Sequence, residues 1–268
     1  MNLEALTTLK VSFFLLGFFV FFLLETYYPN RKWTTPRYKR LLFHIVITVF
    51  NSVLMRIPII FILMPILILV TESQYGLLFI FSDLDSIKFL LSFIVLDISL
   101  YWWHRFNHTN QFLWKFHYVH HVDTHMDVGT SVRFHVGELI LSTMYKAIII
   151  YIFGITVAEY LFYEILLVLS IQFHHSNTKL PANLEKVISK ILVTPQYHTN
   201  HHTTARKSRE ANYSSILTIW DKLFLSYSDA KEEERRHMGL ENRGIELKLI
   251  DNMIYPFKKT LTDNNHNV

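Results

Sequence analysis

The segment FLLSFIVLDISLYWWHRFNH, residues 89–108, runs from an apolar stretch directly into two histidines. Its first fifteen residues carry a single charged side chain, Asp97, which is typical of a helix that lies in a membrane. His104 and His108 follow, four residues apart, so a continued helix presents both imidazoles on one face. The segment therefore predicts a histidine pair at the end of a membrane helix.

The composition extends this prediction to the whole chain. Of 268 residues, 51% are hydrophobic and only 18% are charged, which is too apolar for an ordinary soluble domain of this length. The absence of cysteine excludes disulfides, iron–sulfur ligation and thiolate catalysis. The net charge of +4 is modest and gives no indication of a nucleic-acid partner. We expect an integral, multi-pass membrane protein.

Apolar runs predict an all-α polytopic bundle of about four or five membrane helices. No small-residue cleavage site follows the first run, so we expect a retained helix and not a signal peptide. The second run contains Pro58 and Pro65 and could form one kinked helix or two half-spans that meet near Arg56. The five runs cover residues 11–24, 41–70, 89–103, 137–153 and 157–173.

The distribution of Lys and Arg predicts the orientation of the bundle. With 41–70 as one span, residues 31–40, 104–136 and the tail after 173 share one side and hold five, three and fourteen Lys/Arg. The opposite loops, 71–88 and 154–156, hold only Lys88. The positive-inside rule then predicts a helical, histidine-rich cap on the cytoplasmic side, in either a bacterial inner membrane or the endoplasmic reticulum.

Two further histidine boxes repeat the helical spacing of the first. They are His117-Tyr-Val-His120-His121 and His198-Thr-Asn-His201-His202, and adjacent histidines can reach two different metals. Neutral imidazole is a good ligand for first-row metals, and no carboxylate lies within the boxes, unlike in Glu-rich di-iron bundles. The predicted ligands of a two-metal site are His104, His108, His117, His120, His121, His175, His198, His201 and His202.

Other polar residues are candidates for supporting roles. His135 and His174 are interpreted as further ligands or as hydrogen-bond partners of ligands, and His125 as a partner or surface residue. Asp97 precedes His104 by two helical turns, so it is expected to orient a ligand histidine or a nearby Arg, or else to pair with Arg133 or Lys146. Weaker candidates are Glu138, Glu164, Asn177, Asn212 and Asp221.

For some polar and aromatic residues we expect a structural role and not a functional one. Single histidines near an interface usually act as polar caps or form satisfied hydrogen bonds, and we expect one of these roles for His44, His237 and His266. The run Tyr101-Trp102-Trp103 is interpreted as an interfacial aromatic belt and not a substrate clamp. We divide the chain into N-terminal membrane helices (1–85), a domain with membrane helices and the histidine boxes (86–228) and a polar tail (229–268). Residues 229–243 of the tail are expected to be a solvated helix face or loop.

The chain resembles the fatty acid hydroxylase / sterol desaturase superfamily of membrane di-iron enzymes. The resemblance covers residues 90–227, half the chain, through DISLYWWHRFNH (97–108), WKFHYVHHVD (114–123), TSVRFHVGE (130–138), FHHSN (173–177), TPQYHTNHH (194–202) and NYSSILTIWDKLFLSY (212–227). Ser214 and Leu225 stand where many members have glycine, and His174 where relatives often have another polar residue.

This resemblance implies an oxidoreductase with two iron ions bound by the box histidines and with O₂ as co-substrate. It also implies a separate electron-donor protein, cytochrome b5-like or ferredoxin-like, and a lipid substrate that is hydroxylated or desaturated. Sterol, fatty acyl, sphingolipid, glyceryl-ether and carotenoid substrates remain open, as do the regiochemistry and the oligomeric state.

The alternative is a non-enzymatic membrane metal-binding or metal-transport protein. A transporter would carry polar residues along the midplane of several spans, and only Asp97, Lys146 and Glu164 are candidates for such positions. A haem carrier would place paired histidines deep within facing spans, whereas these boxes lie at helix ends and beyond them.

Overall fold

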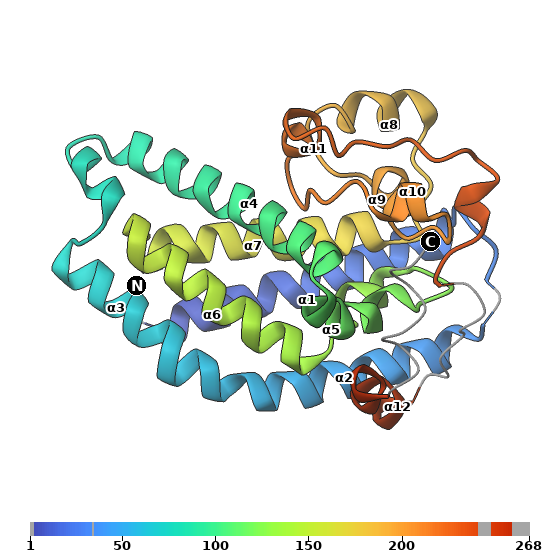
Figure 1. Ribbon diagram of the computed structural model, residues 1–268, viewed down its shortest axis with the longest axis horizontal. Coiled ribbons are helices and arrows are strands. Elements are labelled where there is room, and N and C mark those ends of the chain that lie inside the picture. Colours follow the sequence, from blue (N-terminus) through green and yellow to red (C-terminus); the bar gives the residue numbers. More distant parts are fainter. Residues whose placement is uncertain (1–2, 34, 241–247, 259–268) are drawn as a thin grey trace.

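Helices and loops make up the computed structural model, which describes residues 3–33, 35–240 and 248–258 (Figure 1). Within those ranges extended pairing is limited to isolated bridges such as Pro29–Thr178. Among the described residues, five helices are long and apolar enough to cross a membrane by length and composition. The predicted all-α membrane bundle is therefore confirmed. His266 lies outside the described residues.

Long helices, with the short helical segments that continue or join them, form the body of the molecule. They are α1 (Leu3–Tyr27), α2 (Arg37–Pro58), the π-helix η1 (Ile59–Leu63), α3 (Met64–Ser73), the 3₁₀ helix η2 (Leu77–Phe81), α4 (Asp85–Thr109), α6 (Val136–Phe153) and α7 (Val157–His175). Short elements gather at one end of this body: α5 (Gln111–His121), η3 (Val128–Val132), α8 (Ala182–Ile188), α9 (Pro195–His201), α10 (Arg206–Arg209), α11 (Ile219–Leu223), η4 (Glu234–Arg236), α12 (Leu249–Ile254) and η5 (Tyr255–Phe257).

The proline-containing run forms one long helix and not two half-spans. Helix α2 continues through η1 into α3, and the change from α to π geometry comes immediately after Pro58. Proline removes one backbone donor and crowds the preceding turn, so a widened turn accommodates it without breaking the rod. Figure 1 shows the resulting curved helix along one side of the bundle.

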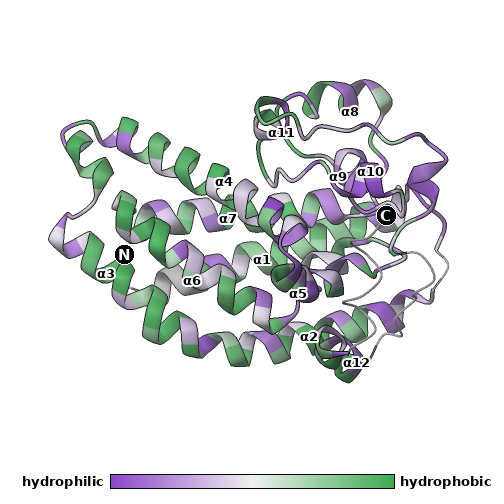
Figure 2. Cartoon of the chain, in the orientation of Figure 1, coloured by the Kyte–Doolittle hydropathy of each residue, from purple (hydrophilic) through white to green (hydrophobic). Residues whose placement is uncertain are grey.

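Apolar side chains lie both between the helices and on their outer surface. Leu67, Leu96, Ile150 and Tyr163 are buried in the main core. Side chains such as Phe61, which is 74% exposed, face outward from the long helices. Figure 2 shows the hydrophobic colour along these helices and the hydrophilic colour at the end that carries the short elements. This pattern is that of a bundle whose outer surface contacts lipid.

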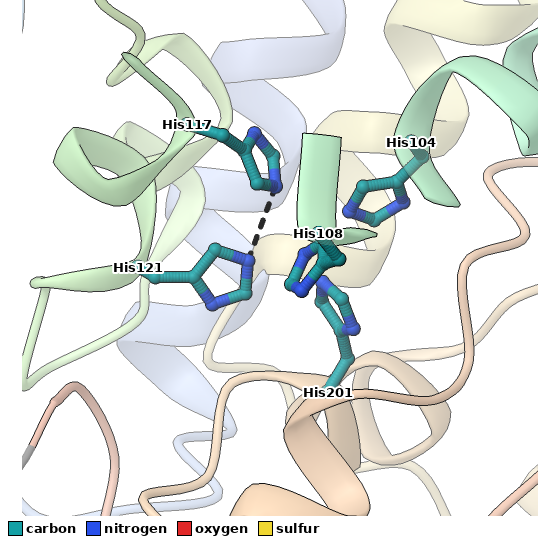
Figure 3. A group of neighbouring side chains, drawn as sticks. All are labelled: His104, His108, His117, His121 and His201. Carbon is teal, nitrogen blue, oxygen red and sulfur yellow. Dashed lines mark hydrogen bonds between the residues drawn. The ribbon is translucent and has the colours of Figure 1, made fainter. Parts of the chain in front are cut away.

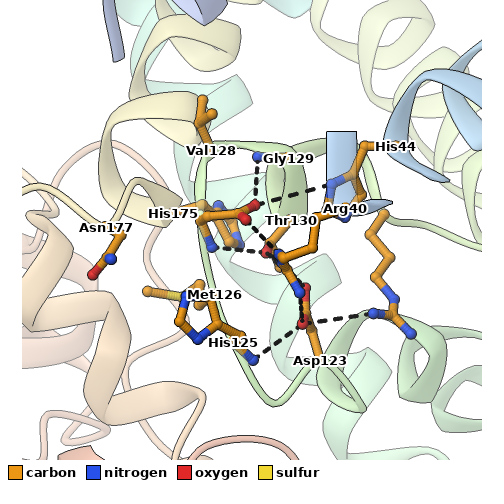
Figure 4. Close-up of polar contacts among 12 residues, drawn as sticks. Arg40, His44, Asp123, His125, Met126, Val128, Gly129, Thr130, His175 and Asn177 are labelled. Carbon is orange, nitrogen blue, oxygen red and sulfur yellow. Dashed lines mark hydrogen bonds and ion pairs between the residues drawn. The ribbon is translucent and has the colours of Figure 1, made fainter. Parts of the chain in front are cut away.

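The N-terminal helices are tied to the histidine-bearing end by buried charges. Arg40 of α2 donates from both Nη atoms to the carboxylate of Asp123 at 2.9 Å, and Thr130 donates to the same carboxylate at 2.8 Å (Figure 4). Although burial raises the pKa of Asp123, Arg40 and Arg133 lower it well below its usual value, so the carboxylate remains charged. Glu25 of α1 accepts hydrogen bonds from the backbone N–H groups of Val128 and Asn177.

The described part of the tail packs on the cap. Met238 and Leu240 are buried, and the N–H of Gly239 donates to the carbonyl of His202 at 3.0 Å. Residues 231–237 are exposed or half-buried, as expected of a solvated segment, whereas residues 238–240 are buried and do not fit that expectation. Residues 241–243 lie outside the described ranges. His237 is exposed and its carbonyl accepts from Thr204 N–H, so the capping role of its side chain stays a prediction.

Candidate metal centre

Four helices bring the nine predicted ligand histidines together. Helix α4 ends with His104 and His108, and α7 ends with His175. The remaining ligands come from α5 and from α9 with its C-terminal residue His202. Asn110 caps α5 by accepting from Phe112 N–H at 2.9 Å, and Thr194 caps α9. The second and third boxes thus lie on short helices that each begin with a side-chain cap.

The nine histidines form two adjoining groups. The five-histidine cluster consists of His104, His108, His117, His121 and His201 (Figure 3). The four-histidine cluster consists of His120, His175, His198 and His202. Within each cluster the ligand nitrogens lie within 4.8 Å of one another, and all nine residues are buried. Both adjacent pairs, His120–His121 and His201–His202, are divided between the clusters, as their helical positions require.

Nitrogen–nitrogen distances in the four-histidine cluster match ligands around a common ion. His175 Nε2 lies 3.0 Å from His120 Nε2 and 3.1 Å from His198 Nε2, and His202 Nε2 lies 3.1 Å from His198 Nε2. Imidazole nitrogens that bind one metal at about 2.1 Å lie roughly 3 Å apart. A chain of neutral imidazoles cannot satisfy all these lone pairs by hydrogen bonding alone, and a cation resolves the conflict.

Backbone carbonyls set the tautomers of several ligands. The Nδ1 atom of His104 lies 2.8 Å from the carbonyl oxygen of Tyr213, that of His201 lies 2.7 Å from the carbonyl oxygen of Ala211, and that of His175 lies 2.8 Å from the carbonyl oxygen of Ile171. Because a carbonyl only accepts, each Nδ1 carries the proton and each Nε2 presents its lone pair to the cluster. The Nε2 atoms of His104 and His201 are buried and have no hydrogen-bond partner.

Two carboxylates support the five-histidine cluster. Glu138 Oε1 accepts from Nδ1 of His117 at 2.9 Å, and Glu210 Oε2 accepts from Nδ1 of His108 at 3.2 Å. Glu138 was a weak candidate in the sequence. Glu210 was missed, because it lies 102 residues from its partner and no local spacing connects the two. Such carboxylates raise the basicity of the ligands they contact.

The environment favours neutral imidazole, the form that binds metal. Burial, followed by the neighbouring histidines, lowers the pKa of His120, His121 and His202 well below its usual value. The same causes lower the pKa of His198, while for His201 a backbone hydrogen bond partly opposes them. Converging lone pairs, unpartnered buried nitrogens and neutral rings together fit two first-row metal ions.

A cavity of about 220 Å³ adjoins both clusters. His104 and His117 of the five-histidine cluster and His120, His175 and His198 of the four-histidine cluster contribute to its wall. The surface of the cavity is mainly apolar. Its apolar wall residues include Leu100, Trp103, Leu139, Leu167, Val168 and Ile171, and polar ones such as Asn107, Ser142 and Ser215 lie among them. An apolar molecule in this cavity would lie beside the converging histidine nitrogens.

The structure places the other candidate histidines outside the two clusters. His135 uses both ring nitrogens, since Nδ1 accepts from Gly137 N–H at 2.9 Å and Nε2 lies 3.1 Å from the carbonyl oxygen of Met253. His174 lines the cavity, and its ring centre is 4.1 Å from that of His198. His125 is buried with its ring centre 5.0 Å from that of Trp33. The expected capping role of His44 is wrong, because the residue lies inside α2; its buried ring has Nδ1 4.0 Å from Asp127, and its Nε2 has no hydrogen-bond partner among the described residues.

The expected role of Asp97 needs correction. Its Oδ2 atom accepts from the indole N–H of Trp220 at 2.7 Å and from Leu217 N–H at 3.2 Å. These donors come from the loop that closes over α4, so the carboxylate anchors this loop and does not contact a ligand histidine or an Arg. The alternative partners are engaged elsewhere: Arg133 donates to Asn252 and Lys146 to Glu164.

The remaining polar candidates also hold loops. Asp221 accepts from Tyr213 N–H and Ser214 N–H, and thereby positions the carbonyl that contacts His104. Asn212 exchanges two hydrogen bonds with Ser228. Asn177 likewise exchanges two with the backbone of Arg31 at the end of α7.

The aromatic run is not a simple interfacial belt. Tyr101 is fully buried and its hydroxyl lies 2.8 Å from Ser226 Oγ, while Trp103 lines the cavity. Trp102 packs on Phe224 with a 4.9 Å separation of ring centres. Consecutive residues of a helix point in different directions, so these three side chains lie in different environments. The sequence run alone did not indicate which side chain lies in which environment.

Leu225 follows α11 in a left-handed conformation, with φ of 54°. This is the position after a helix end where glycine is usual, which explains the glycine of many relatives. Its side chain is 92% exposed, so the substitution strains the backbone without affecting the packing.

The fold and this site define a polytopic membrane protein with a buried two-cluster histidine centre beside an apolar cavity. Its family is shown by comparison: the fatty acid hydroxylase family model matches residues 89–226, and the chain belongs to this family. No solved structure matches the chain.

Curated relatives match somewhat more than half of this chain. An alkylglycerol monooxygenase from Danio rerio is 29% identical over 174 residues, covering 62% of this chain and 36% of the relative. An ornithine lipid hydroxylase from Rhizobium tropici is 23% identical, covering 59% of this chain and 47% of the relative. A sphinganine C4-monooxygenase from Arabidopsis thaliana is 28% identical, covering 58% and 60% respectively. The chain thus spans about a third to three-fifths of the length of these relatives.

Proposed function

We propose that this protein is a di-iron oxidoreductase that uses O₂ to hydroxylate or desaturate a membrane lipid. The observation that carries the proposal is the convergence of nine buried histidines into two adjoining clusters on the wall of an apolar cavity. Membership of the fatty acid hydroxylase family supports an enzyme over the alternative of a metal transporter. The named relatives act on lipids, which supports a lipid substrate.

The five-histidine cluster would hold one iron and the four-histidine cluster the other. Two bound irons would supply the redox chemistry with O₂: R–H, O₂, two electrons and two protons give R–OH and water, while desaturation removes two hydrogens and gives two waters. The carbonyls of Tyr213, Ala211 and Ile171 orient ligand rings. The apolar wall excludes water and holds a C–H bond beside His104, His120 and His175.

The electrons would come from a separate cytochrome b5-like or ferredoxin-like protein. The chain has no cysteine with which to bind an iron–sulfur cluster of its own. Purified protein is combined with NAD(P)H, a reductase and either a cytochrome b5 or a ferredoxin. Product should form with one of these two donors and should not form when both are left out. Product formation with neither added would refute a separate donor.

Metal analysis and Mössbauer spectroscopy of purified protein test the di-iron site. The expected result is about two irons per chain, by the ligand count of two clusters. His120→Ala and His201→Ala should abolish O₂-dependent product formation while membrane insertion is retained. His237→Ala, at an exposed ring, is the matched control and should behave as wild type. An active protein that is iron-free or mononuclear would contradict the proposal.

Comparative lipidomics of cells with and without the gene would identify the substrate. The proposal expects one lipid species to gain an oxygen atom or to lose two hydrogens in an iron-dependent manner. Loss of that conversion with His201→Ala would assign it to this site. A conversion that survives the substitution belongs to another enzyme.

The histidine-bearing end is proposed to face the cytoplasm. The segments 31–40, 104–136 and the tail after 173 carry twenty-two Lys/Arg in all (five, three and fourteen), against one in the opposite loops. Because the chain has no cysteine, Glu232→Cys at the histidine end and Glu72→Cys at the far end can be labelled with an impermeant maleimide. External labelling should reach only Glu72→Cys, and the reverse pattern would overturn the orientation.

A further inference from the structure

Two charged residues line the cavity away from the histidine clusters. Lys146 of α6 and Glu164 of α7 are both wall residues, and Lys146 Nζ lies 2.7 Å from Glu164 Oε1. Lys10 of α1 lies 2.6 Å from the other oxygen, Oε2, but is not a wall residue. The side chain of Glu164 is only 7% exposed. A triad of two ammonium groups and one carboxylate therefore stands at this part of the cavity.

The triad lies within candidate membrane spans, where charged side chains are costly. Lys146 falls in Val136–Phe153 and Glu164 in Val157–His175. A single lysine would neutralise Glu164, so the second leaves one excess positive charge in the triad. Both carboxylate oxygens are already engaged by lysines. The amine of Lys146 has three N–H bonds and can donate to an acceptor in the cavity while it holds Glu164.

The distance between this triad and the histidines follows from the helices. In α6, Lys146 is eight residues after Glu138, which contacts His117 of the five-histidine cluster. In α7, Glu164 is eleven residues before His175 of the four-histidine cluster. At about 1.5 Å per residue these separations correspond to roughly 12 and 16 Å. An extended chain advances about 3.6 Å for every three bonds, so the gap accommodates about ten to thirteen bonds.

We propose that Lys146 is a binding site for an oxygen-bearing group of the lipid, a hydroxyl, carbonyl or carboxylate. This group lies about ten to thirteen bonds from the carbon held at the histidine clusters. Leu139, Leu167 and Val168 line the cavity and pack against the intervening methylenes. Glu164 is a positioning residue that holds the amine at the wall. The spacing rests on the proposed function, because that function defines which carbon reacts. Binding of the oxygen-bearing group at Lys146 does not require metal.

The test uses metal-free protein in detergent with dodecan-1-ol and dodecane as probes at equal mole fraction. Ligand binding to the folded state raises the unfolding midpoint, so the rise produced by each probe reports its affinity. The variants are Lys146→Met, which removes the donor at similar length, and Lys146→Arg, which retains it. Lys10→Met is the matched control, because it removes the other ion pair of Glu164 without changing the cavity wall.

Dodecan-1-ol should stabilise the wild type, Lys146→Arg and Lys10→Met more than dodecane does. In Lys146→Met the affinity for the alcohol should fall about ten- to hundredfold, the loss of one hydrogen bond from a charged donor, and the affinity for dodecane should not fall. Equal stabilisation of the wild type by both probes, or an unchanged response of Lys146→Met to the alcohol, would overturn the proposal. Absence of iron from active protein would contradict the proposed function but would not affect the measured binding of the alcohol at Lys146.

Discussion

The buried contact between Glu138 and His117 offers a direct test of how the five-histidine cluster is tuned. Glu138 Oε1 lies 2.9 Å from His117 Nδ1, and the two side chains are 6% and 3% exposed. Glu138→Gln retains an acceptor of the same shape but removes its charge. A hydrogen bond to a charged group contributes about 1.5–3 kcal/mol and a neutral one about 0.5–1.5, so the change costs roughly 1–1.5 kcal/mol. That corresponds to about tenfold weaker metal binding.

The assay is an anaerobic competition titration of metal-free protein with Fe²⁺ and a chromophoric chelator. Only the binding event of the five-histidine cluster should weaken, because no carboxylate contact is formed by the four-histidine cluster among the described residues. Glu210→Gln should have a smaller effect, since its contact is longer, 3.2 Å, and its side chain is 32% exposed. Glu232→Gln, at a side chain 80% exposed, is the control. Equal affinities for Glu138→Gln and wild type, or weakening confined to the other event, would refute the reasoning.

Three further outcomes follow from the structure. His120→Ala removes a ligand of the four-histidine cluster alone, so metal analysis should find about one tightly bound ion per chain; retention of two would contradict the division of the clusters. Leu225→Gly relieves the left-handed strain at φ of 54° and should raise the free energy of unfolding by about 1 kcal/mol, measured as a higher thermal midpoint. In metal-free protein, burial keeps the pKa of His198, His201 and His202 well below 6.5, so the unfolded state binds more protons below that pH. Denaturant titrations should therefore show stability falling as the pH drops below about 6.5, by up to about 1.4 kcal/mol per pH unit for each group, and a flat profile would contradict neutral burial.

Local periodicity explains which features of the site were predictable. The i, i+3 and i+4 spacing in α5 and α9 places adjacent histidines on different sides of a shared face, so His120 and His121 were expected to reach different metals. The structure separates them between the two clusters in that way. The proline-rich run was ambiguous, because two half-spans and one rod satisfy the same hydropathy pattern. The structure continues the helix through a π-turn after Pro58, a local change of geometry that the hydropathy pattern does not encode.

Long-range partners were not predictable. Asp97 shares a helix face with His104, yet its carboxylate is taken by Trp220, 123 residues away in the chain. Glu210 contacts His108 through an irregular loop with no repeating pattern. Trp103 was expected at an interface and instead lines the cavity, because the rotation of α4 is decided by what packs around it.

The amino-acid sequence by itself determined the membrane helices, the histidine spacing within each box and the gathering of polar segments at one end, since all three depend on local hydropathy and helical geometry. The tertiary structure alone decided how nine histidines divide into two clusters, which carbonyls and carboxylates orient them, and where the cavity meets Lys146. Those arrangements arise from contacts between distant segments, and their geometry is set by the packing of several helices at once. No single stretch of the chain contains that information.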